Sequence, residues 1–256
     1  MHLTMARLHS RERLVVAIAL GVLTLLAWSY LVITGTSRHV DMPMSLPASG
    51  EWGLDMAAIS ALMWCVMMVA MMLPSASPMI LTYTRVHQQR MAHGRAIAPT
   101  WCFIAGYLAT WMGFGLLAAA TQWGLQQSTL ISSTMGKAGP SLGGGLLILA
   151  GSFQFSQLKR ACLSKCRSPL SFLMTEWREG TAGALTMGIR HGAYCIGCCW
   201  ALMLLMFVGG VMSLAWMAAL ALLFLMEKLV PHAHHVSRLI GGLLIAAGLG
   251  ILILSP

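Results

Sequence analysis

The feature that most constrains this sequence is a series of apolar runs, each long enough to cross a lipid bilayer as an α-helix. A transmembrane helix needs about 20 mostly apolar residues. Reading for that length predicts seven spans, over residues 14–34, 56–73, 100–122, 141–158, 184–208, 211–229 and 236–254. The runs are continuous rather than alternating, which is the pattern of helical and not of β-barrel membrane proteins. We therefore expect an all-α, polytopic membrane protein.

Composition excludes the main alternatives to a membrane protein. Charged residues make up 9% of the chain and hydrophobic residues 58%, whereas soluble domains have about 25% and about 45–50%. Disorder requires low hydrophobicity and high charge, so it is excluded as well. The predicted loops are short, and the chain is expected to form a single integral membrane domain, residues 1–256.

The basic residues predict the topology. The net charge of +9 comes from Lys and Arg residues that lie between the apolar runs, which favours membrane orientation and excludes nucleic acid as a partner. With the N-terminus in the cytoplasm, all of the 16 Lys and Arg residues except Arg38 and Lys137 fall on the cytoplasmic side. We therefore expect a multi-pass protein of the bacterial inner membrane with a cytoplasmic N-terminus.

Local signals predict where the helices break. Glycine permits a tight turn, so a hairpin at residues 208–210 separates the fifth and sixth spans. Pro74 and Pro78 are expected to break the helix of the second span at the cytoplasmic boundary. Residues 168–179 are expected to form a short interfacial helix whose apolar side chains, Phe172 among them, lie on lipid.

The strongest chemical signal is the run HGAYCIGCCW, which begins at His191. Helical spacing places Cys195, Cys198 and Cys199 on one face, with His191 one turn earlier. Thiolate and imidazole ligands on one stripe are typical of a site for Cu(I), Zn or another thiophilic ion. The alternative is that these cysteines are small hydrophobic residues that pack between helices.

Cys162 and Cys166 form a second pair, spaced to share one face if the helix continues until Pro169. Both cysteine groups fall on the predicted cytoplasmic side, where thiols stay reduced. This favours metal binding or redox chemistry over structural disulfides. The alternative is a pair of ordinary free thiols near the membrane interface.

A methionine stripe and one acidic residue complete the set of candidates. Met63, Met67 and Met71 share one face of the second span, and thioethers are suitable ligands for Cu(I), although methionine stripes also serve as adaptable packing. Glu227 is a candidate proton carrier because it lies in an apolar stretch, with an interfacial ion pair as the alternative. Weaker metal candidates lie in predicted loops: His39, Met42, Met44, His232, His234 and His235.

With these residues in view, the sequence resembles a family of predicted metal-binding integral membrane proteins, the domain of unknown function 2182. The matching segments are MWCVMMVAMMLPSASPM at 63–79, LKRACLSKCRSP at 158–169, GALTMGIRHGAYCIGCCWALM at 183–203 and GGVMSLAWMAALALLFLMEK at 209–228. The resemblance implies a helical membrane fold and a metal site. It names neither the metal nor a reaction.

The leading hypothesis is an inner-membrane protein that binds a thiophilic transition metal and acts in metal transfer or metalloenzyme maturation. Cu(I) is favoured over Zn, and the expected partners are the lipid bilayer and a metallochaperone or cuproenzyme. One alternative is a metal- or thiol-dependent oxidoreductase for a lipophilic substrate, in which Glu227 or His191 moves protons. A third is a structural subunit of a larger membrane complex, and whether the protein is an enzyme stays open.

Overall fold

The computed structural model describes residues 2–36, 54–92, 98–132, 136–230 and 233–254. This part of the chain contains helices and no strand, apart from an isolated bridge between Ile131 and Ala138. The helices are α1 (His2–Thr36), α2 (Leu54–Ala92), α3 (Thr100–Gln127), α4 (Pro140–Phe153), α5 (Gln157–Arg167), α6 (Pro169–Glu176), α7 (Gly180–Met203), α8 (Met206–Gly209), α9 (Leu214–Leu229) and α10 (Ala233–Leu254). The all-α prediction is confirmed for the described residues.

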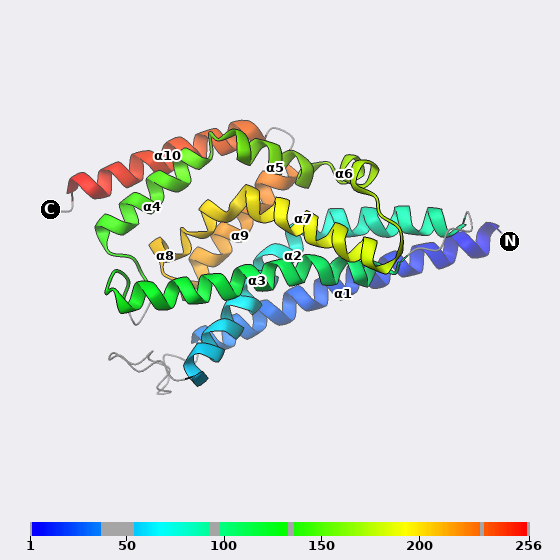
Figure 1. Ribbon diagram of the computed structural model, residues 1–256, viewed down its shortest axis with the longest axis horizontal. Helices are drawn as coiled ribbons and strands as arrows, with labels where there is room; N and C mark the ends of the chain where they lie inside the picture. The colour runs from blue at the N-terminus through cyan, green and yellow to red at the C-terminus, as the bar shows by residue number, and fades with distance from the viewer. Residues whose placement is uncertain (1, 37–53, 93–97, 133–135, 231–232, 255–256) are drawn as a thin grey trace.

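The helices form an elongated bundle in which α7 lies near the middle (Figure 1). The most extensive pairings are α4 with α10, α3 with α7, and α1 with α2. The short helix α5 follows α4 and then packs along α7, while α2 also contacts α3 and α9. This arrangement brings the cysteine-bearing helices α5 and α7 side by side.

Five helical segments in the described part are long and apolar enough to cross a membrane: Arg11–Gly35, Leu54–Met91, Thr100–Gln127, Gly180–Gly209 and His234–Leu254. Every predicted span falls on helical segments, although the fourth and fifth each include the end of one helix and part of the next, and the count of seven is not confirmed. The reason is length, because α4 has 14 residues and α9 has 16, fewer than the about 20 that a span needs.

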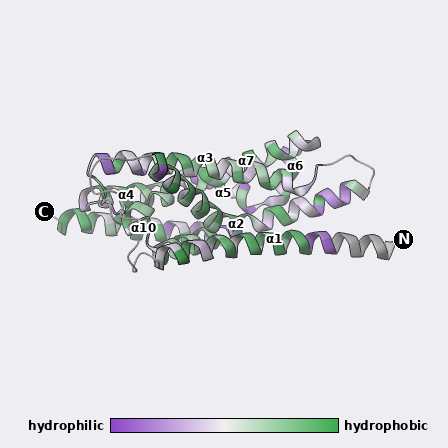
Figure 2. Cartoon of the chain, turned by 90° about the horizontal axis from the view of Figure 1, so that it is seen from below, coloured by the Kyte–Doolittle hydropathy of each residue, from purple (hydrophilic) through white to green (hydrophobic). Residues whose placement is uncertain are grey.

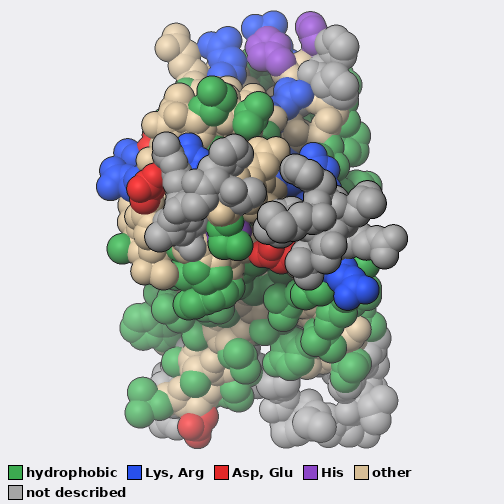
Figure 3. Space-filling view, turned by 90° about the vertical axis from the view of Figure 1, so that its right-hand side faces the viewer, with side chains coloured by type: hydrophobic (Ala, Val, Ile, Leu, Met, Phe, Trp, Pro, Cys, Tyr) green, Lys and Arg blue, Asp and Glu red, His purple; other side chains and the backbone are tan. Residues whose placement is uncertain are grey.

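The outer helices expose apolar side chains as a membrane protein does. Leu14 and Leu25 on α1 are 60% and 68% exposed, and Leu239 on α10 is 67% exposed. Figure 2 shows hydrophobic residues along both helices. Figure 3 views the end of the bundle at the right of Figure 1, where Lys, Arg and His side chains gather above a hydrophobic region. Soluble proteins rarely expose apolar surface on this scale.

The prediction that Pro74 and Pro78 break a helix is wrong, because α2 continues through both to Ala92. A proline leaves the carbonyl four residues earlier without its helical donor. Trp28 Nε1 donates to the Ala70 carbonyl at 3.1 Å, which replaces the donor that Pro74 lacks. The Ser77 hydroxyl donates to the Pro74 carbonyl at 2.6 Å, which replaces the donor that Pro78 lacks. Side chains thus satisfy the freed backbone groups and the helix persists.

The predicted turn is confirmed, whereas the predicted lipid-facing side of the short helix is wrong. The predicted turn at residues 208–210 is present, since Gly210 has a φ of 92° and ends α8. The predicted interfacial helix exists as α6, but Phe172 and Leu173 are buried in the core and do not face lipid. The candidates His39, Met42, Met44 and His232 lie outside the described residues.

Glycines set the distance between α3 and α7. A Cβ added at Gly188 would lie 2.1 Å from the Phe103 carbonyl oxygen, and one at Gly106 would lie 2.2 Å from the Leu185 oxygen. Both distances are far too short for a side chain, so the two backbones are in direct contact. This contact holds the cysteine face of α7 against Tyr107 of α3.

Candidate metal centre

The three cysteines of α7 share one buried face, as their spacing predicts. Cys195, Cys198 and Cys199 are each at most 1% exposed. The Cys198 and Cys199 thiols donate to the Cys195 carbonyl at 3.1 and 2.9 Å, which is the back-bonding that this spacing allows on a helix. The sulfur of Cys195 points to other partners.

A buried lysine binds the Cys195 sulfur. Lys228 Nζ of α9 donates to Cys195 Sγ at 3.0 Å and to the Ser75 hydroxyl of α2 at 2.7 Å. The Tyr107 hydroxyl lies 3.4 Å from the same sulfur and donates to the Met72 carbonyl at 3.1 Å. An ammonium in contact with a sulfur stabilises the thiolate, which is the form that binds metals.

The cysteines of α5 join the same region. Cys166 is buried on α5, the helix that packs along α7. Cys162 lies over Gly197, where an added Cβ would be 2.7 Å from Cys162 Sγ. The two predicted cysteine groups therefore form one cluster, which we call the cysteine cluster: Cys162, Cys166, Cys195, Cys198 and Cys199. The sequence did not predict this union, because it depends on how α5 packs on α7.

The cysteine cluster has the donors for a soft metal, but its sulfurs are held by protein groups. In the part of the chain that the structure describes, no three His, Cys, Asp or Glu side chains are arranged to hold a metal ion. Two thiols are turned to a carbonyl and Cys195 contacts Lys228. Metal binding therefore requires Cys198 or Cys199 to rotate about its Cα–Cβ bond toward Cys195.

His191 occupies an aromatic pocket beside the cluster. Its ring lies 5.3 Å from that of Phe172, 5.7 Å from Tyr107 and 6.0 Å from Phe103, measured between centroids. Its Nδ1 is buried without a hydrogen-bond partner in the described part of the protein. The side chain is therefore available as a ligand, and its role stays a prediction.

The methionine stripe lies on the inner side of α2. Met67 and Met71 are each 1% exposed, and Met63 is half-buried. Met63 and Met67 border a pocket next to the end of α1. As an i, i+4 series, the stripe continues to Ser75, which contacts Lys228.

Glu227 lies in a closed ion pair. Its two oxygens each accept from Lys159 Nζ at 2.8 Å, and one also accepts from the Ser237 hydroxyl at 2.9 Å. The partner is Lys159, not the adjacent Lys228. A carboxylate held by three hydrogen bonds is suited to joining α5, α9 and α10 rather than to carrying protons.

Sequence reasoning missed the burial of two lysines. The topology count places Lys159 and Lys228 among the charges on the cytoplasmic side, but they are 1% and 8% exposed. Tyr107, whose hydroxyl lies 3.4 Å from Cys195 Sγ, was not among the predicted site residues either. One signal was present, because Lys228 falls inside the predicted span 211–229, and a charge within a span marks a functional or paired residue.

Comparison with known proteins gives one match. The sequence model of the family described as "PpoB2: Copper chaperone" matches residues 61–251. The match includes the whole cysteine cluster, the methionine stripe and Lys228. It supports the copper relation that the residues predict, whereas the family name expected from the sequence resemblance is not confirmed. No curated protein and no solved structure matches the chain.

Proposed function

The chain belongs to the PpoB2 family of copper chaperones, and on this premise we propose that it binds Cu(I) at the cysteine cluster inside a membrane and passes the ion to a cuproenzyme. The observation that carries the proposal is the contact between Cys195 Sγ and Lys228 Nζ, amid the four other buried thiols of the cysteine cluster. Thiolates are soft ligands that select Cu(I) over harder ions.

Charge balance favours Cu(I) over Zn(II) at this place. A buried site within a membrane is costly unless its charges cancel. The Cys195 thiolate and the Lys228 ammonium cancel before copper arrives. When Cu(I) binds Cys195 and a second thiol, that thiol releases its proton. The charges of the copper ion, the two thiolates and the Lys228 ammonium then sum to zero again. A divalent zinc ion with the same ligands would leave an uncompensated positive charge.

Transfer follows from the spread of thiols across two helices. Copper held by Cys195 and Cys198 can exchange one ligand for Cys166 of the same cluster, and the proton of the entering thiol then passes to the departing thiolate. Cys162, also on α5, lies at the edge of the same cluster. It would be the last thiol to bind copper before the ion passes to the cuproenzyme. Each step replaces one sulfur ligand by another, and the copper keeps its oxidation state.

The membrane arrangement is part of the proposal. The protein spans the bacterial inner membrane several times with its N-terminus in the cytoplasm, as the basic residues indicate. The Lys, Arg and His side chains that gather at the end of the bundle shown in Figure 3 support this orientation. The oxidoreductase and structural-subunit alternatives receive no support from the family match, and the ion pair of Glu227 with Lys159 argues against a proton carrier there.

The test is anaerobic Cu(I) loading of the purified full chain, without a metal-binding tag, followed by removal of loose copper and metal analysis. Wild type should retain copper with sulfur ligands visible by X-ray absorption. The Cys195→Ser/Cys198→Ser/Cys199→Ser variant should lose the thiolate-bound copper, whereas the matched control Cys65→Ser should not. A folded triple variant that keeps the same thiolate-bound copper would contradict the proposal.

A further inference from the structure

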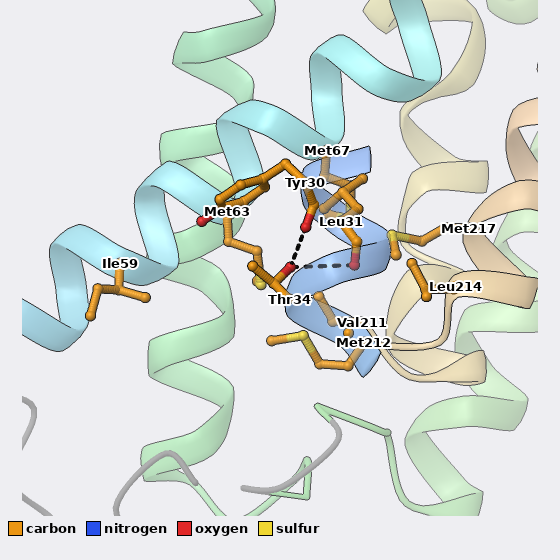
Figure 4. Close-up of a pocket in the computed structure, with 11 residues that line it drawn as sticks. Tyr30, Leu31, Thr34, Ile59, Met63, Met67, Val211, Met212, Leu214 and Met217 are labelled. Atoms are coloured by element: carbon orange, nitrogen blue, oxygen red, sulfur yellow. Dashed lines mark hydrogen bonds between the residues drawn. The ribbon is translucent and has the colours of Figure 1, made fainter. Parts of the chain in front are cut away.

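A small pocket away from the cysteine cluster is lined by methionines from three segments. It has a volume of about 40 Å³ and lies between α1, α2 and the start of α9. Its methionines are Met63 and Met67 of α2, Met212 of the turn before α9, and Met217 of α9. Figure 4 shows these side chains around the part of α1 that carries Leu31 and Thr34.

We propose that this methionine pocket is a second Cu(I) site, which exchanges copper with the cysteine cluster; this inference rests on the proposed function. Thioethers bind Cu(I) without losing a proton, so they hold the ion reversibly. A space of this volume suits an ion or a water molecule, not an organic ligand.

Two polar side chains also line the pocket, Tyr30 with its phenol hydroxyl and Thr34. The Thr34 hydroxyl donates to the carbonyls of Tyr30 and Leu31 at 2.8 and 3.3 Å. The remaining wall contributed by Leu31, Val211 and Leu214 is apolar. The thioether sulfurs are the soft donors of the pocket, and an apolar wall around them favours a soft monovalent ion over hydrated divalent ions.

One face of α2 connects the pocket to the cysteine cluster. Met63, Met67, Met71 and Ser75 follow one another at four-residue intervals and so share a face. Ser75 contacts Lys228, which binds Cys195. At 1.5 Å per residue, Met67 and Ser75 are about 12 Å apart along the helix, with buried Met71 between them.

Copper would move along this face by ligand exchange. Each step breaks one copper–thioether bond as another forms, with no electron transferred. A proton leaves only at the end, where a thiol becomes a copper ligand and the proton passes to water. The pocket lies where α1 ends and α2 begins, the end that the predicted topology places outside, so the two sites differ in depth.

The experiment compares Cu(I) capacity and ligation in variants of the full chain labelled with selenomethionine. Copper-edge absorption then separates selenium from sulfur ligands. In wild type both should appear. The Met63→Leu/Met212→Leu/Met217→Leu variant, which conserves apolar volume, should lose the copper–selenium signal and about half of the bound copper. The control Met174→Leu, at an exposed position on α6, should lose neither.

The two proposals fail separately. The cysteine triple variant should keep the copper–selenium signal while losing thiolate ligation. If wild type shows no copper–selenium signal, or if the pocket variant keeps it with full capacity, the methionines are packing and the second site is refuted. If copper binds with selenium ligands alone in wild type, the cysteine cluster proposal fails and the methionine pocket stands.

Discussion

Replacing Glu227 by Gln tests how much the ion pair that joins α5, α9 and α10 contributes to stability. The side chains of Lys159 and Glu227 are 1% and 3% exposed, and both carboxylate oxygens accept from the ammonium at 2.8 Å. The amide conserves shape and can still accept from the Ser237 hydroxyl. The variant therefore removes one charge and leaves the Lys159 ammonium buried without compensation.

The expected loss is large because the lone ammonium cannot reach water. Breaking a buried pair by removing one partner costs about 3–5 kcal/mol. The loss should appear as a lowered midpoint in reversible unfolding, measured by titrating denaturing detergent into mild detergent. The matched control is Glu179→Gln, whose carboxylate is 61% exposed and lies 3.9 Å from Arg90. An exposed pair contributes about 0–1 kcal/mol, so this variant should be near wild type.

A double variant separates charge compensation from packing. Lys159→Met/Glu227→Leu removes both charges, so it should recover most of the stability lost by the single variant. Copper bound per folded chain should be unchanged in all three proteins, since the pair lies outside the cysteine cluster. The reasoning is refuted if Glu227→Gln unfolds at the wild-type midpoint, or if the double variant is less stable than the single one.

Three further variants test the copper site and the helix packing. Lys228→Gln should weaken Cu(I) retention about 10–100-fold in competition with a Cu(I) chelator, as loss of a supporting residue does, whereas Arg238→Gln should not. Gly188→Ala should lower stability by about 1–3 kcal/mol or more, because its Cβ meets a backbone oxygen at 2.1 Å. Gly113→Ala, with nothing within 4 Å, should be neutral or stabilising. Trp28→Phe should cost about 1–3 kcal/mol in thermal unfolding, because it leaves the carbonyl freed by Pro74 unpaired.

Apolar run length was enough to locate the helices but not their ends. Hydropathy identifies the apolar segments of a chain. Each predicted span accordingly falls on helical segments. Where a helix stops depends on caps and neighbours. The fourth predicted span is divided at residues 154–156, where α4 ends and the Ser156 hydroxyl accepts from the Lys159 amide to start α5. Hydropathy alone does not predict this division.

The prolines of α2 show why local rules fail inside a bundle. A proline within a membrane helix is costly when the carbonyl that it frees, here that of Ala70, meets only lipid. Here Trp28 of α1 supplies a donor at the required place, and that pairing depends on tertiary packing between residues 42 apart in the sequence. Pro78 is different, because its compensating donor, Ser77, is the residue before it. This local compensation could have been predicted.

The adjacent charges at the end of α9 explain why the proposed copper site would contain a thiolate. Consecutive helical residues point about 100° apart, so Glu227 faces Lys159 while Lys228 faces α2 and α7. Glu227 is thus unable to compensate Lys228, although they are neighbours in sequence. The hydrogen-bond acceptors of Lys228 in the described part are a neutral hydroxyl and the Cys195 sulfur, so the sulfur is the group that can supply the opposing charge. A lysine fixed in this position stabilises the Cys195 thiolate, so under the proposed function this ligand is prepared before any metal arrives.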